Sequence, residues 1–155
     1  MARVHVDIQL RWGDQDEYGH VNNVSFARYL EEARVRIFSL GTGRERTGLE
    51  VLFEGSGSRA HKMLVASQRI EFTDVLHYGE DPAVVELWIG QVGGSSLEIH
   101  CEIVDGSSTE RRVVARSITN VVLVDGETLR PKRLSDEERA AIEPWTDVPV
   151  AMRRG

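Results

Sequence analysis

The sequence has almost no cysteine, no long apolar run and no excess of basic residues, and each shortage excludes a class of protein. Cys101 is the only cysteine, so neither an intrachain disulfide nor a zinc site made of several thiolates is possible. No segment approaches the roughly 20 apolar residues that a membrane-spanning helix requires. The net charge of −6 disfavours nucleic-acid binding, since such binders are usually basic. We therefore expect a cytoplasmic protein that binds neither membrane nor nucleic acid.

Linkers, internal repeats and low-complexity tracts are also missing from the sequence. The 155 residues, of which 41% are hydrophobic, are enough for one globular domain with a single core. The sequence contains neither a glycine-rich phosphate loop with its lysine nor a G-x-S-x-G element. We therefore expect one domain over residues 1–155 that works without a cofactor.

Hydrophobic periodicity predicts strands, one long helix and a short C-terminal helix. Apolar and polar residues alternate over residues 4–10, which is typical of a strand with one buried face. Apolar residues recur at spacings of four and three from Phe26 to Leu40, which predicts a largely buried helix ended by Gly41. Ser135 is expected to cap the C-terminal helix. Further strands are predicted over 64–72, 83–92, 97–104 and 113–124, and residues 42–60 are predicted to be a loop with at most one helical turn.

The last four predicted strands follow one another closely and favour an antiparallel sheet. Gly93 and Gly94 tolerate positive φ and predict a two-residue hairpin turn. Glu98, His100 and Glu102 alternate with apolar residues, which indicates a sheet face open to solvent or to another subunit. The predicted fold class is α+β, with a five-stranded antiparallel sheet around one long central helix. Since one helix covers only part of such a sheet, we expect a homodimer or a homotetramer.

The segment RWGDQDEYGHVNNVSFARYLEEAR, residues 11–34, places aspartates, a histidine and asparagines directly before the helix. Asp and Asn at this position commonly cap helices and form turns. A carboxylate close to the unpaired amides of a first helical turn also has the parts of a hydrolytic site, namely a nucleophile or base and donors for a developing oxyanion. The local pattern leaves both interpretations open.

A longer motif favours the second interpretation. Its members are Asp14, Asp16, Gly19, His20, Val21, Asn22, Asn23, Phe26, Glu31, Ala33 and Arg34. On these residues the chain resembles the hotdog-fold thioesterases of the hydroxybenzoyl-CoA thioesterase type, and most closely the acyl-CoA and acyl-carrier-protein thioesterases with a D-x-D-x-x-G-H-V-N-N motif. The resemblance covers nearly the whole chain and is weaker over 41–59 and after Trp145. It implies a hotdog fold and an acyl-CoA thioesterase.

The same resemblance assigns roles to individual residues. It implies that Asp16 is the nucleophile or the general base, and that the main-chain N–H of Asn23 polarises the thioester carbonyl. His20 is expected to hydrogen bond to Asp16 or to orient a water molecule, whereas Asp14 is expected to hold the loop. Tyr18 stands where D-x-N-x-H relatives have an asparagine, so its phenol either replaces that amide or lines the pocket.

Several alternatives stay open at this point. Trp12, Tyr18 and Asn22 are expected to contact the substrate, and no metal is expected because the acidic loop lacks further ligands. Basic residues of the segment 130–133 either meet the phosphates of coenzyme A or form a solvated turn. The chain is an acyl-CoA thioesterase, with acyl-carrier protein as a second carrier, or a non-catalytic module that binds acyl-CoA. The intact segment from Asp16 to Asn23 favours the enzyme.

Overall fold

The computed structural model describes residues 2–54 and 61–153 and contains a five-stranded antiparallel sheet in the order β1-β3-β4-β5-β2. The alternating pattern of the sequence therefore predicted the sheet correctly. β2 begins before the predicted Leu64, and residues 55–60 of the predicted loop lie outside the described residues. The strands are β1 (Val4–Ile8), β2 (His61–Phe72), β3 (Ala83–Val92), β4 (Ser96–Val104) and β5 (Val113–Asp125).

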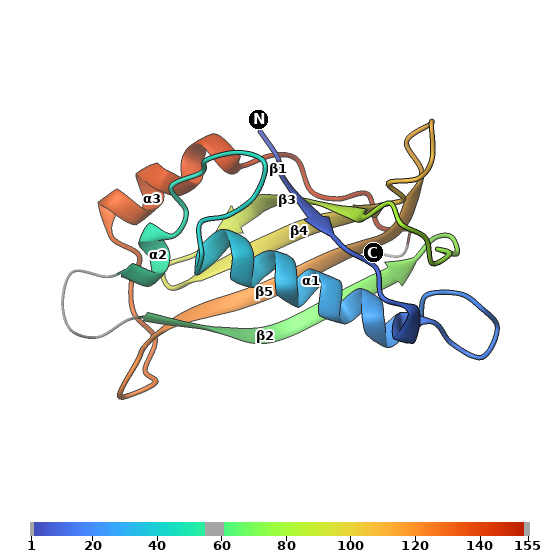
Figure 1. Cartoon of the computed structure of the whole chain (residues 1–155). Coiled ribbons are helices and arrows are strands. Elements are labelled where there is room, and N and C mark those ends of the chain that lie inside the picture. Colours follow the sequence, from blue (N-terminus) through green and yellow to red (C-terminus); the bar gives the residue numbers. More distant parts are fainter. Residues whose placement is uncertain (1, 55–60, 154–155) are drawn as a thin grey trace.

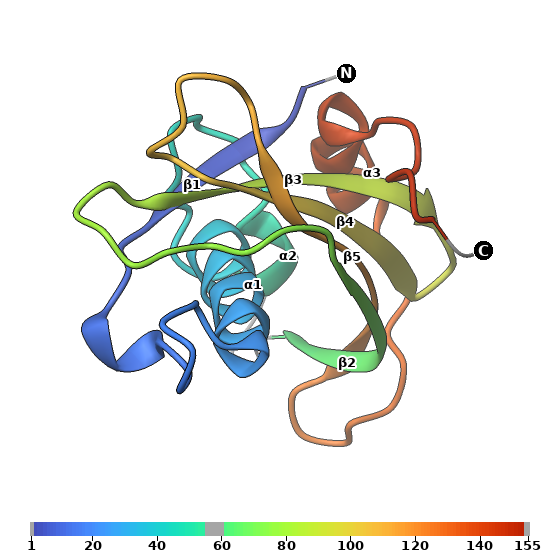
Figure 2. The same ribbon diagram turned by 90° about the vertical axis from the view of Figure 1, so that its right-hand side faces the viewer.

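Helix α1 (Asn23–Phe38) lies against the inner face of the sheet, which curves around it (Figures 1 and 2). The structure also has two short helices, α2 (Val51–Glu54) and α3 (Asp136–Ile142), at one end of the molecule (Figure 1). The helical part therefore consists of α1 and two short helices, of which α3 was predicted, and not of one long helix alone. Ser135 caps α3 as predicted, because its hydroxyl accepts the Glu138 N–H at 3.1 Å.

One side of α1 is buried, and the other is not. Phe26, Leu30, Ala33 and Ile37 are at most 2% exposed and pack into the core. Val35 is 46% exposed and Leu40, which lies beyond the helix end, is 64% exposed. The prediction of a largely buried helix is therefore wrong, because the sheet contacts only one stripe of it. Gly41 does take the predicted left-handed conformation, with φ of 64°.

The hairpin between β3 and β4 differs from the predicted one. It has the three residues 93–95, and Gly93 and Gly94 do not take positive φ. The pairing of the two strands shifts register between Ile89 and Val92. This irregularity near the turn leaves room for a third loop residue, so a two-residue turn is not needed.

The outer face of β4 is covered by the chain itself. His100 and Glu102 are only 1% and 8% exposed. The His100 Nδ1 accepts the Val150 N–H at 3.1 Å, and the guanidinium of Arg3 donates to Glu102 at 3.1 Å. The predicted open face is therefore wrong, since segments from both ends of the chain cover it. Within the described ranges, no helix is long and apolar enough to cross a membrane.

Candidate active site

The segment between β1 and α1 is organised around the buried carboxylate of Asp14. This residue is 5% exposed, and its Oδ2 accepts hydrogen bonds from the Arg11 N–H at 3.0 Å and from the Tyr29 hydroxyl at 2.7 Å. Its main-chain carbonyl accepts the Asn22 N–H at 2.8 Å and the Ser25 hydroxyl at 3.2 Å. Most of these contacts tie the segment to α1. Asp14 is thus placed to hold the segment in position.

Asp16 closes the tip of this segment into a tight turn. Its Oδ1 accepts the N–H groups of Tyr18 at 2.8 Å and of His20 at 3.1 Å. Gly19 lies inside the turn with φ of 77°, which an L side chain rarely adopts. The His20 N–H, with that of Tyr18, lowers the pKa of the Asp16 carboxyl below its usual range because it stabilises the charged form. The second oxygen, Oδ2, accepts no hydrogen bond from any described residue.

The first turn of α1 offers a main-chain donor. Asn22 is the N-cap, with extended backbone, and its side chain accepts the Val24 N–H at 3.1 Å. The N–H of Asn23, the first helical residue, makes no hydrogen bond within the described ranges. Such N–H groups at a helix start carry partial positive charge. The Asn23 N–H can therefore stabilise an oxygen on which negative charge develops.

The linker between β2 and β3, residues 73–82, lies beside this segment. The Val21 N–H donates to the Leu76 carbonyl at 2.8 Å, and His20 forms an isolated β-bridge with His77. The imidazole rings of His20 and His77 meet edge to face with centroids 5.0 Å apart. Figure 1 shows the two segments at the end of the molecule opposite α2 and α3. Segments distant in sequence thus form one surface.

An open depression of about 310 Å³ lies between the two segments. It brings together three of the predicted residues, Asp16, His20 and Asn23. The cavity thus combines a carboxylate, an imidazole and a main-chain donor with an apolar wall. The full lining is polar at Asp16, His20, Asn23, Thr73 and Asp74, and apolar at Val21, Phe26, Phe72 and Val75.

The wall formed by residues 72–75 was not predicted from the sequence. The segment DVLHYGED, residues 74–81, resembles the strand-linking turn of the family, but its sequence does not show that the segment lies opposite Asp16. Phe72 is 45% exposed, and its ring lies 5.7 Å from that of Phe26. Its position at the end of β2 gave no local sign that it would face the start of α1.

The other predicted site residues lie outside this lining. Trp12, in the 3-10 turn η1 (Trp12–Asp14), is 76% exposed, and Tyr18 is 75% exposed. The Asn22 side chain caps α1 instead of facing the depression. His20 reaches Asp16 through its main-chain N–H, while its ring contacts His77. The expected hydrogen bond between His20 and Asp16 is thus made by the main chain of His20 and not by its ring, and the orientation of a water molecule by the ring stays a prediction.

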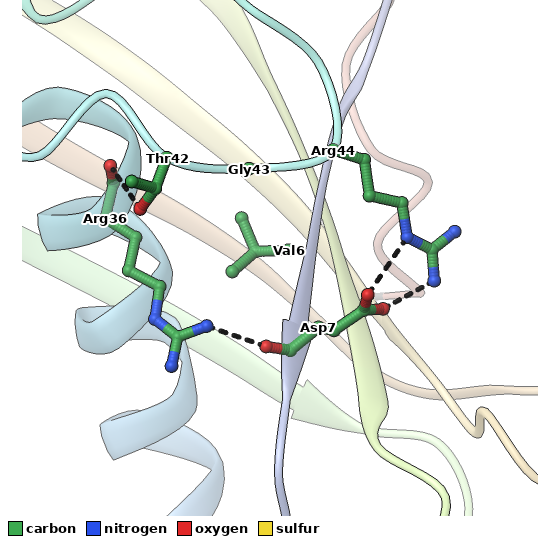
Figure 3. A pocket seen from close by; sticks show the side chains of 6 residues that line it. All are labelled: Val6, Asp7, Arg36, Thr42, Gly43 and Arg44. Carbon is green, nitrogen blue, oxygen red and sulfur yellow. Dashed lines mark hydrogen bonds and ion pairs between the residues drawn. The ribbon is translucent and has the colours of Figure 1, made fainter.

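A second pocket, of about 220 Å³, lies between β1 and the segment after α1 (Figure 3). Arg36 donates to the Asp7 carbonyl at 2.9 Å, and Arg44 pairs with the Asp7 carboxylate. Thr42 and Gly43 complete the rim. Both guanidiniums already have acceptors on Asp7. These contacts hold α1 and the segment 42–44 against β1, and the pocket offers no reactive group.

The side chains that could ligate a metal ion are not clustered among the described residues. Residues 2–54 and 61–153 contain no group of three or more His, Cys, Asp or Glu side chains that could hold a metal ion. The candidate site is the depression around Asp16 and Asn23.

Comparison with known proteins places this site in a family context. The model of the thioesterase-like superfamily matches residues 10–145. A protein from Pseudomonas aeruginosa, provisionally described as a thioesterase, is 30% identical, with a TM-score of 0.71 over 90% of this chain and 97% of that one. A thioesterase from Thermus thermophilus, solved with coenzyme A and zinc, is 26% identical, with a TM-score of 0.69 over 92% and 93%.

A predicted thioesterase from Bacillus stearothermophilus shares the fold, with 24% identity and a TM-score of 0.74 over 96% of this chain and 99% of that one. No curated protein shows significant sequence similarity to the chain.

Proposed function

Because the chain belongs to the thioesterase-like superfamily, we propose that it is an acyl-CoA thioesterase whose active site is the depression around Asp16. Membership of the family supports thioester hydrolysis in general, and the acyl-CoA substrate is the specific part of the proposal. The Thermus thermophilus relative binds coenzyme A, which is consistent with this carrier. The hotdog type of fold and a single domain over residues 1–155 belong to the same proposal.

In this mechanism the thioester carbonyl oxygen accepts the Asn23 N–H, and the carbonyl carbon faces Asp16 Oδ2. As a nucleophile, Asp16 forms a mixed anhydride with the acyl group and expels the thiolate of coenzyme A, and water then hydrolyses the anhydride. As a general base, Asp16 takes a proton from water while the hydroxide adds to the carbonyl carbon, and the tetrahedral intermediate then breaks its C–S bond and expels the thiolate of coenzyme A. The lowered pKa of Asp16 keeps the carboxylate charged near neutral pH, which both routes require.

His20 and the apolar wall have supporting roles in the proposal. The His20 ring lines the depression and can pass a proton to the departing thiolate. Phe72 and Val75, which are 45% and 43% exposed, provide the surface on which the acyl group rests, and the buried Phe26 lies behind Phe72. Trp12 and Tyr18 are exposed beside the site and meet the substrate only outside the depression.

The observation that carries the proposal is the pairing of Asp16 and Asn23 in one cavity. A non-catalytic module that binds acyl-CoA needs an apolar wall, but it needs neither an unpaired carboxylate oxygen nor a free helix N–H beside it. Hydrolysis of an acyl thioester carried by acyl-carrier protein uses the same chemistry and differs only in the carrier of the acyl group. The reaction is therefore proposed for both carriers, with acyl-CoA as the first choice.

We also propose a cytoplasmic homodimer or homotetramer. β2 is an edge strand of the sheet, and its Leu64 and Val65 are 44% and 49% exposed. Val65 also lines a groove with Val35 of α1. A second copy seated on this surface would cover the apolar side chains and the open strand edge. Light scattering should find two or more chains, and an active monomer at assay concentration would contradict the proposal.

The function is tested by incubating the purified protein with linear and aromatic acyl-CoA esters and a thiol reagent. Asp16→Asn should lower kcat at least about 100-fold, because it removes the nucleophile or base while keeping an oxygen that accepts the turn hydrogen bonds. Asp14→Asn should lower the melting temperature more than kcat, and His20→Ala should lower kcat to an intermediate degree. Glu17→Gln, which removes a neighbouring exposed carboxylate, is the matched control and should leave kcat unchanged.

Two outcomes would refute parts of this proposal. If wild-type protein binds acyl-CoA without hydrolysing any ester, the chain is a binding module. If Asp14→Asn is folded and inactive while Asp16→Asn is active, the assignment of Asp16 as the catalytic aspartate is wrong. Incorporation of ¹⁸O from labelled water into Asp16 in a single turnover would identify Asp16 as the nucleophile, because water that attacks the Asp16 carbon of the anhydride leaves its oxygen there, whereas the general-base route never labels Asp16.

A further inference from the structure

The wall of the depression opposite Asp16 is held in place from behind by β5. The Thr73 N–H donates to the Val114 carbonyl at 2.9 Å, and its hydroxyl donates to the Val113 carbonyl at 2.8 Å. Three residues further on, the Leu76 carbonyl accepts the Val21 N–H at 2.8 Å. The linker thus lies between β5 and the segment that carries Asp16. Its position sets the width of the depression.

Between these two attachments, Arg112 holds the linker at its bend. Its guanidinium donates to the Val75 carbonyl at 2.9 Å and pairs with the Asp74 carboxylate at 2.8 Å. The second amino group pairs with Asp105, which is 9% exposed and is itself fixed by the Ser107 N–H at 2.9 Å. A planar fork that contacts a carbonyl and two carboxylates orients the linker more strictly than a point charge would.

The Asp74 carboxylate lines the same depression as Asp16. The side-chain hydrogen bond from Arg112 lowers the pKa of Asp74 below its usual range, so Asp74 is charged at any pH at which the enzyme would work. An unpaired second carboxylate would disfavour the charged form of Asp16. It would also repel the polyanionic coenzyme A.

We propose that Arg112 is a positioning residue of the active site, which fixes the linker wall opposite Asp16 and neutralises Asp74. The inference rests on the proposed function. Arg112 touches neither Asp16 nor the depression, and it acts through Val75 and Asp74. Two effects are therefore separable, one of geometry and one of charge.

The charge effect is measured as a change in the pKa of Asp16, which also depends on the other titratable groups around Asp16. His20 and Glu17 belong to the same turn, and His77 and Asp74 face it from the linker. These groups are identical in wild type and in the Arg112 variants. A change in the titration of Asp16 that occurs in Arg112→Gln, is absent in Arg112→Lys and is reversed by Asp74→Asn therefore reports the loss of the Arg112 charge from Asp74.

Arg112→Gln should lower kcat/KM about 10-fold or more, because the wall moves relative to the reacting atoms. In the pH profile of kcat/KM, the acid limb should also move to higher pH by about half a pH unit. This is the shift expected from repulsion between two partly exposed carboxylates, Asp74 and Asp16, in water. The double variant Arg112→Gln/Asp74→Asn should return the acid limb to its wild-type position without restoring the full rate. Arg112→Lys keeps the charge and loses the fork, so its acid limb should stay in place while its rate falls.

Arg111→Gln is the matched control. Arg111 is the neighbouring arginine and also contacts two carboxylates, Glu86 and Glu102, but on the outer face of the sheet. Its loss should lower the melting temperature and leave the pH profile unchanged. A shift of the acid limb by both variants would overturn the proposal, since it would report general destabilisation.

A readout without turnover separates this inference from the proposed function. The carboxyl carbon of Asp16, assigned by its absence in Asp16→Asn, is titrated by NMR in each protein, and hydrogen exchange is followed at the Val21 N–H. Arg112→Gln should raise the pKa of Asp16 and accelerate exchange at Val21, whether or not any acyl-CoA is hydrolysed. An unchanged pKa of Asp16 overturns the charge effect, and unchanged exchange in both Arg112→Gln and Arg112→Lys overturns the positioning effect.

Discussion

Replacing Tyr29 by phenylalanine tests whether Asp14 anchors the site segment. The Tyr29 hydroxyl donates to Asp14 Oδ2 at 2.7 Å, and both residues are 5% exposed. Burial, together with the hydrogen bond to Asp14, raises the pKa of the Tyr29 hydroxyl above its usual range, so the phenol stays a donor at all working pH values. Tyr29→Phe removes only this oxygen and leaves the aromatic ring in the core.

The expected cost follows from the contacts of Asp14. After the substitution, Asp14 Oδ2 keeps the Arg11 N–H at 3.0 Å and loses its shorter hydrogen bond. A hydrogen bond to a charged group is worth about 1.5–3 kcal/mol. For a domain of this size, a loss of about 2 kcal/mol lowers the melting temperature by about 4–8 °C.

Thermal and urea unfolding measure this loss, and Tyr18→Phe provides the control. Tyr18 is 75% exposed, and it meets Asp16 through its main-chain N–H, which the substitution retains. Tyr18→Phe should therefore leave the melting temperature unchanged. If Tyr29→Phe is as stable as wild type, the Asp14 carboxylate does not depend on this donor, and the assignment of Asp14 as the anchor of the segment is wrong.

Three further predictions concern parts of the fold away from the site. Burial raises the pKa of the Cys101 thiol to about 12, so native protein should react with a thiol reagent at least about 100-fold more slowly than a free thiol; rapid reaction of one equivalent would contradict its burial. Ser135→Ala removes the cap of α3 and should cost about 1 kcal/mol in urea unfolding, with Ser135→Gly less affected. Burial alone would raise the pKa of Glu102, but hydrogen bonds from three arginines, Arg116, Arg111 and Arg3, lower it. The stabilising contribution of the Glu102 carboxylate is therefore present at neutral pH. It is lost as the pH falls below about 4 and through the lowered pKa of Glu102. The free energy of unfolding should thus decrease less between pH 6 and 3 in Glu102→Gln than in wild type.

Local features of the chain were predictable because the sequence records them directly. The alternation of apolar residues places Leu97, Ile99, Cys101 and Ile103 on the inner face of β4, where all are at most 2% exposed. The left-handed conformation of Gly41, which lies beyond the end of α1 at Phe38, and the cap at Ser135 depend on conformations of a few adjacent residues. The helix start that follows the polar segment is of the same kind.

Features that depend on distant segments were not predictable in the same way. A one-helix pattern does not say which stripe of α1 the sheet will contact, so the exposure of Val35 was missed. Nor does the alternation in β4 show that Arg3 and the stretch near Val150 will cover its polar face. Burial of these groups arises from packing, which periodicity does not encode.

The same division applies to the candidate site. The turn around Asp16 and the helix start at Asn23 are set by local sequence, because both are formed by hydrogen bonds within a few residues. The position of the linker with Asp74 and Val75 on the opposite wall, and its contact with Arg112, arise from packing between distant segments. The physical reason is that these contacts depend on the register of β2 against β5, and no local pattern of residues specifies that pairing.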